Sequence, residues 1–216
     1  MPRTRVKICC MASPAEAEMA AAAGADLVGL VGPMPSGAGI VSPETCREVS
    51  HATPAWVTPV LLTSSESAEA LEADIRFADV RTVQLVRHAP PEFHTRLKAA
   101  IPGLKILQVI HVEGMEALDL IDSYAEADAF LLDSGRPGSA ELGGTGRTHD
   151  WSVSAAFVAK SPVPVFLAGG LNPGNVAEAI TQVRPFGIDI CSGVRTDDKL
   201  DAAKLAAFMT AVGGAT

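Results

Sequence analysis

The feature that most constrains this chain is an eightfold alternation of short apolar runs with amphipathic or alanine-rich segments. Runs that are apolar on both faces are typical of parallel strands covered by helices. The apolar runs cover residues 6–10, 27–31, 56–62, 82–86, 105–112, 129–133, 163–168 and 187–192. Eight strand-then-helix units predict an α/β protein, a single (β/α)8 TIM barrel over residues 1–216. An open doubly wound sheet is the structural alternative.

Composition limits the function classes. The 216 residues carry a net charge of −8, and their basic residues are dispersed, which argues against a nucleic-acid surface. No run of about 18 apolar residues is present, so a membrane span is not expected. The N-terminal residues lack the apolar core of a signal peptide. We therefore expect a cytoplasmic protein that binds neither nucleic acid nor membrane.

The four cysteines are Cys9, Cys10, Cys46 and Cys191, and their spacing fits neither a C-x-x-C motif nor a zinc template. In a reducing compartment a disulfide is not expected. Cys46 and Cys191 are therefore predicted to be small buried hydrophobic residues. Side chains alternate along a strand, so Cys10 is predicted to pack outward, on the face opposite to Cys9.

Two strand ends carry candidate catalytic groups, because active sites of such barrels lie at the carboxyl ends of the strands. Cys9 ends the first run and shares its face with Lys7, which is poorly suited to the apolar helix layer. Asp133 ends the sixth run, where burial without a partner or a role is unfavourable. A thiol and a carboxyl group could divide general base and general acid catalysis. The structural alternatives are a buried hydrophobic Cys9 and a capping or ion-paired Asp133.

Glycine-rich segments follow the last three apolar runs: ELGGTGRTHDW, LAGGLNPGNV and ICSGVRTDD. Glycine lets main-chain N–H groups approach an anion closely, and in this class of barrel a phosphate commonly binds after strands seven and eight. Ordinary turn glycine is the alternative interpretation. We therefore expect a phosphate-binding region at these strand ends.

The motifs together resemble phosphoribosylanthranilate isomerase, a barrel family of tryptophan biosynthesis. The family shows K-I-C-G where this chain has residues 7–10, so Cys10 stands at a glycine position. The resemblance spans the whole chain and is most specific in its second half. Further matching segments are residues 24–29, 83–85, 131–134, 143–146 with 150–151, 168–176 and 187–194.

The resemblance implies an Amadori rearrangement, in which an N-(5-phosphoribosyl) aldosylamine becomes a 1-amino-1-deoxyribulose 5-phosphate without cofactor or metal. The family's acid corresponds to Asp133, which would protonate the ribose ring oxygen. The family's base corresponds to Cys9, which would take the C2 proton. The implied ligand is a small phosphosugar, and the chain is expected to be a monomer or a homodimer. The implied phosphate-binding residues are Gly144, Gly146, Gly169, Gly170, Ser192 and Gly193.

Three positions depart from the family pattern. The family has S-P-R after strand two, with an arginine for the anthranilate carboxylate, where this chain has glycine, alanine and glycine at 37–39. Arg87 replaces the glycine of a His-Gly pair, and Arg195 replaces a glutamate. Because guanidinium–carboxylate pairs are strong, Arg87 or Arg195 is expected to contact the substrate, together with Lys7. The alternatives are a paralogue acting on another phosphorylated ligand in a secondary pathway, and a barrel that binds a phospholigand without turnover.

Overall fold

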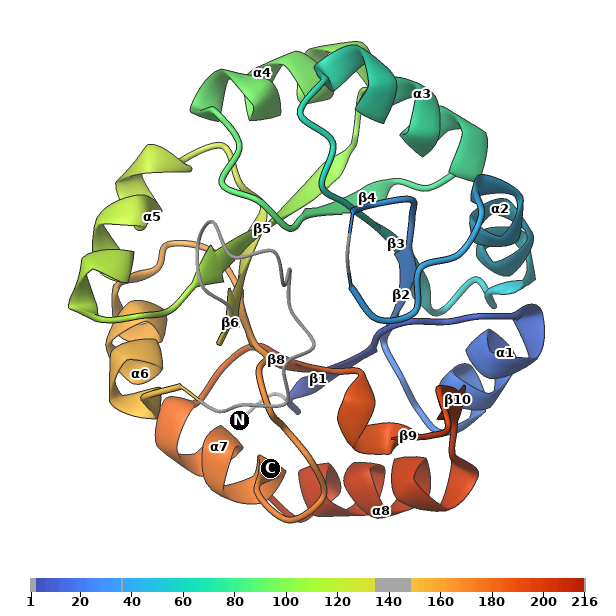
Figure 1. The fold of residues 1–216 in the computed structure, drawn as a ribbon. Helices are drawn as coiled ribbons and strands as arrows, with labels where there is room; N and C mark the ends of the chain where they lie inside the picture. The colour runs from blue at the N-terminus through green and yellow to red at the C-terminus, as the bar shows by residue number, and fades with distance from the viewer. Residues whose placement is uncertain (1–2, 36, 135–148, 216) are drawn as a thin grey trace.

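A computed structural model of the chain describes residues 3–35, 37–134 and 149–215. Eight parallel strands close into a barrel, in which the last strand pairs with the first (Figure 1). Closure confirms the predicted (β/α)8 fold and excludes the open sheet. The strands are β1 (Arg5–Ile8), β2 (Leu27–Val31), β3 (Thr58–Thr63), β4 (Thr82–Leu85), β5 (Lys105–His111), β6 (Ala129–Asp133), β7 (Val165–Leu167) and β8 (Gly187–Ile190).

Helices surround the barrel (Figure 1), and their starts follow from local sequence. Side-chain oxygens of Ser13, Ser42 and Ser67 accept first-turn N–H groups, which is the usual N-cap arrangement. The predicted fifth helix is instead a 3₁₀ helix, Met115–Asp119, followed by α5 (Leu120–Ser123). The other helices are α1 (Pro14–Ala22), α2 (Pro43–Ala52), α3 (Ala68–Ala78), α4 (Pro91–Ala100), α6 (Trp151–Lys160), α7 (Val176–Val183) and α8 (Ala202–Gly213).

The hydrophobic core has two layers. An outer layer between strands and helices includes Ile110, and an inner layer inside the barrel includes Val109 and Leu131. Because side chains alternate along a strand, His111 and Asp133 share the inward face with this inner layer. They are also register partners on β5 and β6. The strand pattern therefore directs two titratable groups into the mouth of the barrel.

A short hairpin follows β8, where the sequence analysis predicts only a connection. Its strands are β9 (Arg195–Thr196) and β10 (Lys199–Leu200), which lie beside α1 and α8 in Figure 1. Asp197 and Asp198 have φ angles of 49° and 59°, as a two-residue type I′ turn requires. Among the described residues, the helices are too short or too polar to span a bilayer.

Candidate active site

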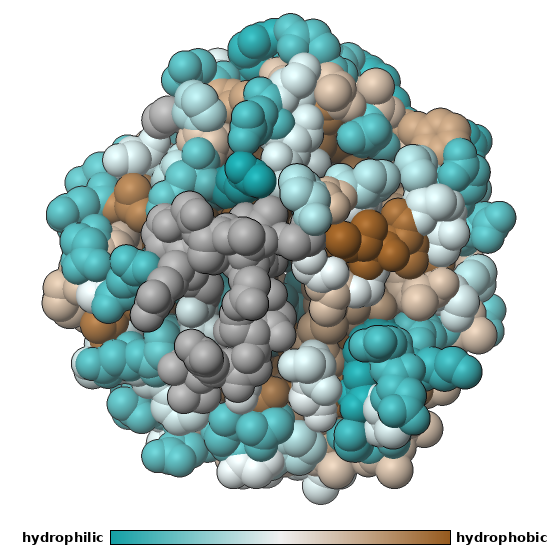
Figure 2. Space-filling view, in the orientation of Figure 1, coloured by the Kyte–Doolittle hydropathy of each residue, from teal (hydrophilic) through white to brown (hydrophobic). Residues whose placement is uncertain are grey.

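A pocket opens at the carboxyl ends of the strands, where the sequence predicts the active site. It encloses about 560 Å³ when the open space at its mouth is included. Residues from the two ends of the chain and from its middle line it, including Cys9, His111, Asp133 and Asp189. On this face, apolar atoms gather over the connection between β2 and α2 (Figure 2).

Cys9 follows β1, and its side chain is buried at this pocket. Burial raises the pKa of the thiol to about 11. The Lys7 ammonium and the N–H of Cys10 favour the thiolate, whereas the Asp189 carboxylate opposes it. Cys9 is therefore a neutral thiol in the resting protein, and work as a base requires loss of its proton.

Lys7 and Asp189 form an ion pair inside the barrel. They are register partners on β1 and β8, with Lys7 Nζ 2.9 Å from Asp189 Oδ1, and the Lys7 side chain is fully buried. Burial alone would lower the pKa of Lys7, but Asp189 and Cys9 outweigh it, so the pKa is raised. Lys7 is thus a charged group held by Asp189, and it is Asp189 that reaches the pocket lining.

Asp133 ends β6 and lines the same pocket as Cys9. Its Oδ1 accepts a hydrogen bond of 2.7 Å from the N–H of Ser134. Burial raises the pKa of Asp133, and the Asp189 charge adds to this effect, although Ser134 and His111 oppose it. A carboxyl group that keeps its proton more readily than an exposed aspartate is suited to general acid catalysis.

His111 ends β5 and lines the same pocket. Its Nε2 lies 3.0 Å from the main-chain oxygen of Val86. Since a carbonyl oxygen only accepts, Nε2 carries the proton. Among the described residues, the buried Nδ1 has no hydrogen-bond partner. The site therefore includes an imidazole beside Asp133.

Glycine positions shape the ends of β7 and β8. Gly169 and Gly170 have φ angles of +84° and +63°, which favour glycine. A methyl group on Gly193 would overlap the main-chain oxygen of Leu171. These glycines allow close packing of the two loops, and with Ser192 their role in binding phosphate stays a prediction. Gly144 and Gly146 lie outside the described residues.

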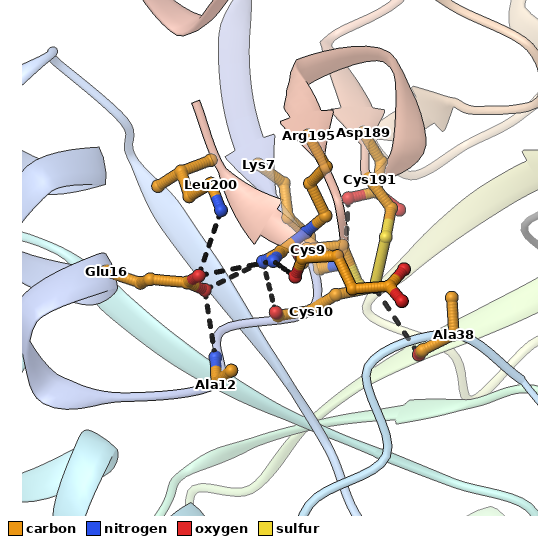
Figure 3. Close-up of a disulfide and its surroundings, with 11 residues drawn as sticks. Lys7, Cys9, Cys10, Ala12, Glu16, Ala38, Asp189, Cys191, Arg195 and Leu200 are labelled. Atoms are coloured by element: carbon orange, nitrogen blue, oxygen red, sulfur yellow. Dashed lines mark hydrogen bonds and ion pairs between the residues drawn. A yellow bond between two sulfur atoms is a disulfide. The ribbon is translucent and has the colours of Figure 1, made fainter. Parts of the chain in front are cut away.

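The structure corrects the prediction for two cysteines. Cys10 and Cys191 form a disulfide with their Cα atoms 6.0 Å apart, whereas Cys191 was expected to be a free hydrophobic residue (Figure 3). Barrel closure makes β1 and β8 neighbours, so residues 181 apart in sequence meet. Cys10 was expected to pack outward, but with a φ of 69° it lines the pocket together with Cys191. Cys46 is free and buried, as predicted.

The two arginines proposed for substrate contact have other partners. Arg195 pairs with Glu16 at 2.9 Å and donates to the main-chain oxygen of Cys10 (Figure 3). Arg87 pairs with the exposed Glu66 at 3.0 Å. Neither guanidinium lines the pocket among the described residues. Side-chain geometry therefore gives no support to substrate contact by Arg87 or Arg195, because protein groups already engage both.

Fold and pocket together define a class of protein: a (β/α)8 barrel with a thiol and a carboxyl group of raised pKa at its mouth, beside glycine-rich loops. The described part of the chain contains no group of three or more His, Cys, Asp or Glu side chains that could hold a metal ion. The position of the pocket matches the barrel enzymes whose chemistry occurs at the carboxyl ends of the strands.

Comparison with known proteins narrows this class. Residues 6–211 match the family model of N-(5'phosphoribosyl)anthranilate (PRA) isomerase. The N-(5'-phosphoribosyl)anthranilate isomerase of Methanocella arvoryzae is 36% identical over 197 residues, 91% of each chain. The chain therefore belongs to the N-(5'-phosphoribosyl)anthranilate isomerase family, and it is an isomerase of the aldose–ketose type.

Solved structures agree with this assignment. The phosphoribosyl anthranilate isomerase of Thermotoga maritima superposes with a TM-score of 0.85 at 30% identity, covering 98% of this chain and 99% of that chain. A further isomerase structure, at 29% identity and a TM-score of 0.82, is a complex with reduced 1-(O-carboxyphenylamino)-1-deoxyribulose 5-phosphate, and it covers 98% of this chain and 99% of its own. That relative binds a phosphorylated ligand.

Proposed function

We propose that this chain converts N-(5'-phosphoribosyl)anthranilate into 1-(o-carboxyphenylamino)-1-deoxyribulose 5-phosphate. One observation carries the proposal: in a member of this family, Cys9 and Asp133 line the same pocket although 124 positions separate them (133 − 9). Asp133 supplies a proton and Cys9 removes one, so the two halves of an aldose–ketose isomerisation have one group each.

The reaction begins at the ribose ring. Asp133 protonates the ring oxygen, the C1–O bond breaks, and the nitrogen lone pair forms an iminium ion at C1. The Cys9 thiolate then takes the proton from C2, and the electrons of that C–H bond form an enamine. The enamine gains a proton at C1 and loses one from the C2 hydroxyl, which leaves a ketone at C2. In total, C1 and the former ring oxygen each gain a hydrogen, and C2 and its hydroxyl oxygen each lose one.

The protonation states set the difficulty of this reaction. Burial raises the pKa of both Asp133 and Cys9, the latter to about 11. Because Cys9 ionises only near pH 11, the form with a Cys9 thiolate, which the reaction needs, is a minor species near neutral pH. Lys7 favours the thiolate, and the positive iminium ion would favour it further. We assign to Lys7 this electrostatic role through Cys9.

The phosphate would bind beside the ends of β7 and β8. Gly169 and Gly170 adopt backbone conformations that favour glycine, and Gly193 leaves no room for a side chain. Main-chain N–H groups at such positions bind anions. Ser192 belongs to the same loop, and Gly144 and Gly146 are proposed for it from the family resemblance alone.

The test is direct turnover. Purified protein is given N-(5'-phosphoribosyl)anthranilate, and formation of the aminodeoxyribulose phosphate is followed by mass spectrometry. We expect turnover that is proportional to enzyme and that restores growth of an auxotroph lacking this isomerase. Folded protein that gives neither product nor growth would contradict the proposal.

A second candidate function is isomerisation of an N-phosphoribosyl compound with another aglycone. Residues 37–39 supply no cation, and Arg87 and Arg195 are paired elsewhere. A recognition contact for the carboxylate is therefore missing among the described residues. The two functions are distinguished by measuring kcat/KM for N-phosphoribosyl arylamines with and without an ortho carboxylate. A higher kcat/KM for the substrate without the carboxylate favours the second function.

A further inference from the structure

The disulfide between Cys10 and Cys191 lies in the wall of the pocket that also holds Cys9 (Figure 3). We propose that this cysteine pair is a redox modification site, at which reduction by a dithiol lowers isomerase turnover and reoxidation restores it. The activity readout rests on the proposed function, whereas the state of the sulfur atoms can be measured without it.

Cys10 has an unfavourable backbone conformation that neighbouring contacts must stabilise. Its φ of 69° lies in the left-handed region, which is unfavourable for an L-residue. The contacts that hold the residue there include the bond to Cys191 and the hydrogen bond that its main-chain oxygen accepts from Arg195. Cutting the disulfide removes the only covalent restraint from a disfavoured conformation.

The loop between β2 and α2 packs directly on this cysteine pair. Cys10 Sγ lies 3.6 Å from the main-chain oxygen of Ala38, and a methyl group on Gly39 would overlap Cys10. Bonded sulfur atoms are about 2 Å apart, whereas two thiols need about 3.5 Å or more. Because the loop leaves no free space on its side, separated thiols must displace the loop or enter the pocket. Reduction therefore changes the shape of the substrate site.

Reduction of the disulfide also affects the ionisation of Cys9, the candidate base. The N–H of Cys10 interacts with Cys9 and favours its thiolate. Cys9 and Cys10 are consecutive, so relaxation of the Cys10 backbone turns this N–H away from the Cys9 sulfur. Loss of that interaction makes the thiolate harder to form. The oxidised protein is therefore the more active form.

Of the two bonded cysteines, Cys191 is the more exposed residue. Cys191 is partly exposed at the pocket, whereas Cys10 is only 4% exposed. A reductant thiolate attacks Cys191 Sγ, the S–S bond breaks, and Cys10 leaves with the electron pair and takes a proton from water. The second thiol of the reductant then displaces Cys191, so two electrons and two protons reach the protein and the reductant ends as a disulfide.

The experiment combines thiol counting with kinetics. Full-length protein is purified without reductant, alkylated after unfolding, and analysed by mass spectrometry. We expect two alkylated cysteines, Cys9 and Cys46, in the oxidised protein and four after treatment with dithiothreitol. Reduction should lower kcat/KM by up to about 10²-fold, the effect of a misplacement of about 1 Å in an active site, and diamide should restore it.

Variants separate the disulfide from general effects of reductant. Cys191→Ala and Cys10→Gly should show the same kcat/KM with and without dithiothreitol, whereas the control Cys46→Ala should keep the full redox response. Four alkylated cysteines after diamide treatment, or equal kcat/KM in the two states of the natural sequence, would overturn the inference.

A binding measurement keeps this inference separate from the proposed function. Calorimetry with reduced 1-(o-carboxyphenylamino)-1-deoxyribulose 5-phosphate should show weaker binding to the reduced protein, whether or not the protein turns over substrate. If the protein shows no turnover but its affinity for this ligand still depends on the redox state, only the proposed function is contradicted. Equal affinities would contradict the redox inference.

Discussion

The two seams of the barrel that carry the proposed base and acid are built differently. At the seam of β1 and β8, a disulfide, the buried Lys7–Asp189 pair and the Arg195–Glu16 pair all join the strands and their loops near Cys9. At the seam of β5 and β6, Asp133 is held by the N–H of its neighbour Ser134. The difference indicates that changes near the base alter structure and stability, whereas changes at the acid alter chemistry.

Replacing the acid should give the largest effect. Asp133→Asn keeps the shape of the side chain and removes its proton, so kcat should fall by roughly 10²–10⁴-fold with little change in stability. Steady-state kinetics and urea unfolding measure the two quantities, with the exposed Asp122→Asn as the control. A nearly normal kcat would remove Asp133 from the mechanism.

Breaking the buried ion pair between Lys7 on β1 and Asp189 on β8 should lower the stability of the fold. Lys7→Met leaves Asp189 as an uncompensated buried charge, so the free energy of unfolding should fall by about 3–5 kcal/mol. Urea titration measures this loss. Lys105→Met is the matched control, because its ammonium pairs with Asp128 at the surface and such pairs contribute only about 0–1 kcal/mol. Equal losses in the two variants would show that burial of Lys7 is unimportant.

Breaking the ion pair between Glu16 and Arg195, which lies beside Cys10, should give a smaller effect that depends on pH. Burial alone would raise the pKa of Glu16, but Arg195 and the N–H of Leu200 outweigh it, so the folded-state pKa is lowered. The carboxylate therefore stabilises the fold above its unfolded pKa of about 4.3, and this contribution is lost as pH falls through the folded pKa.

In numbers, Glu16→Gln should lower the free energy of unfolding by about 1–3 kcal/mol near neutral pH. The difference from the natural sequence should shrink in acid, as shown by urea titrations at several pH values. A difference that stays constant with pH would contradict the assignment of charge to Glu16.

The pH dependence of kcat/KM sharpens the comparison without any substitution. Because burial raises the pKa of Asp133, the acidic limb should lie above the ordinary aspartate range of about 3.9. The active form keeps one proton on the Asp133–Cys9 pair, so kcat/KM should fall on the alkaline side where that last proton is lost. This alkaline limb should lie near pH 11, the pKa of Cys9. A fall in kcat/KM already near pH 8.5, the value for an ordinary thiol, would show that the pocket leaves Cys9 unperturbed.

The sequence predicted the strands of the barrel well, but it did not predict the contacts between the segments that follow β1 and β8. Apolar runs with clear ends, such as Leu27–Val31 and Ala129–Asp133, gave strands with the predicted bounds. Cys9 and Asp133 could be selected because polar groups that end buried strands are rare. The partners of Cys10 and Arg195 lie 181 and 179 residues away, so they depend on how the segments after β1 and β8 meet, which local patterns do not report. An assumed reducing environment also led the sequence analysis away from a disulfide.

The most direct test of the central claim is a crystal structure with reduced 1-(o-carboxyphenylamino)-1-deoxyribulose 5-phosphate bound. The account predicts C2 of the ligand within roughly 3–3.5 Å of Cys9 Sγ, the oxygen that once closed the ribose ring beside the Asp133 carboxyl group, and the phosphate against Gly170 and Gly193. A ligand whose C2 faces away from Cys9, with Asp133 contacting no oxygen of the sugar, would contradict it.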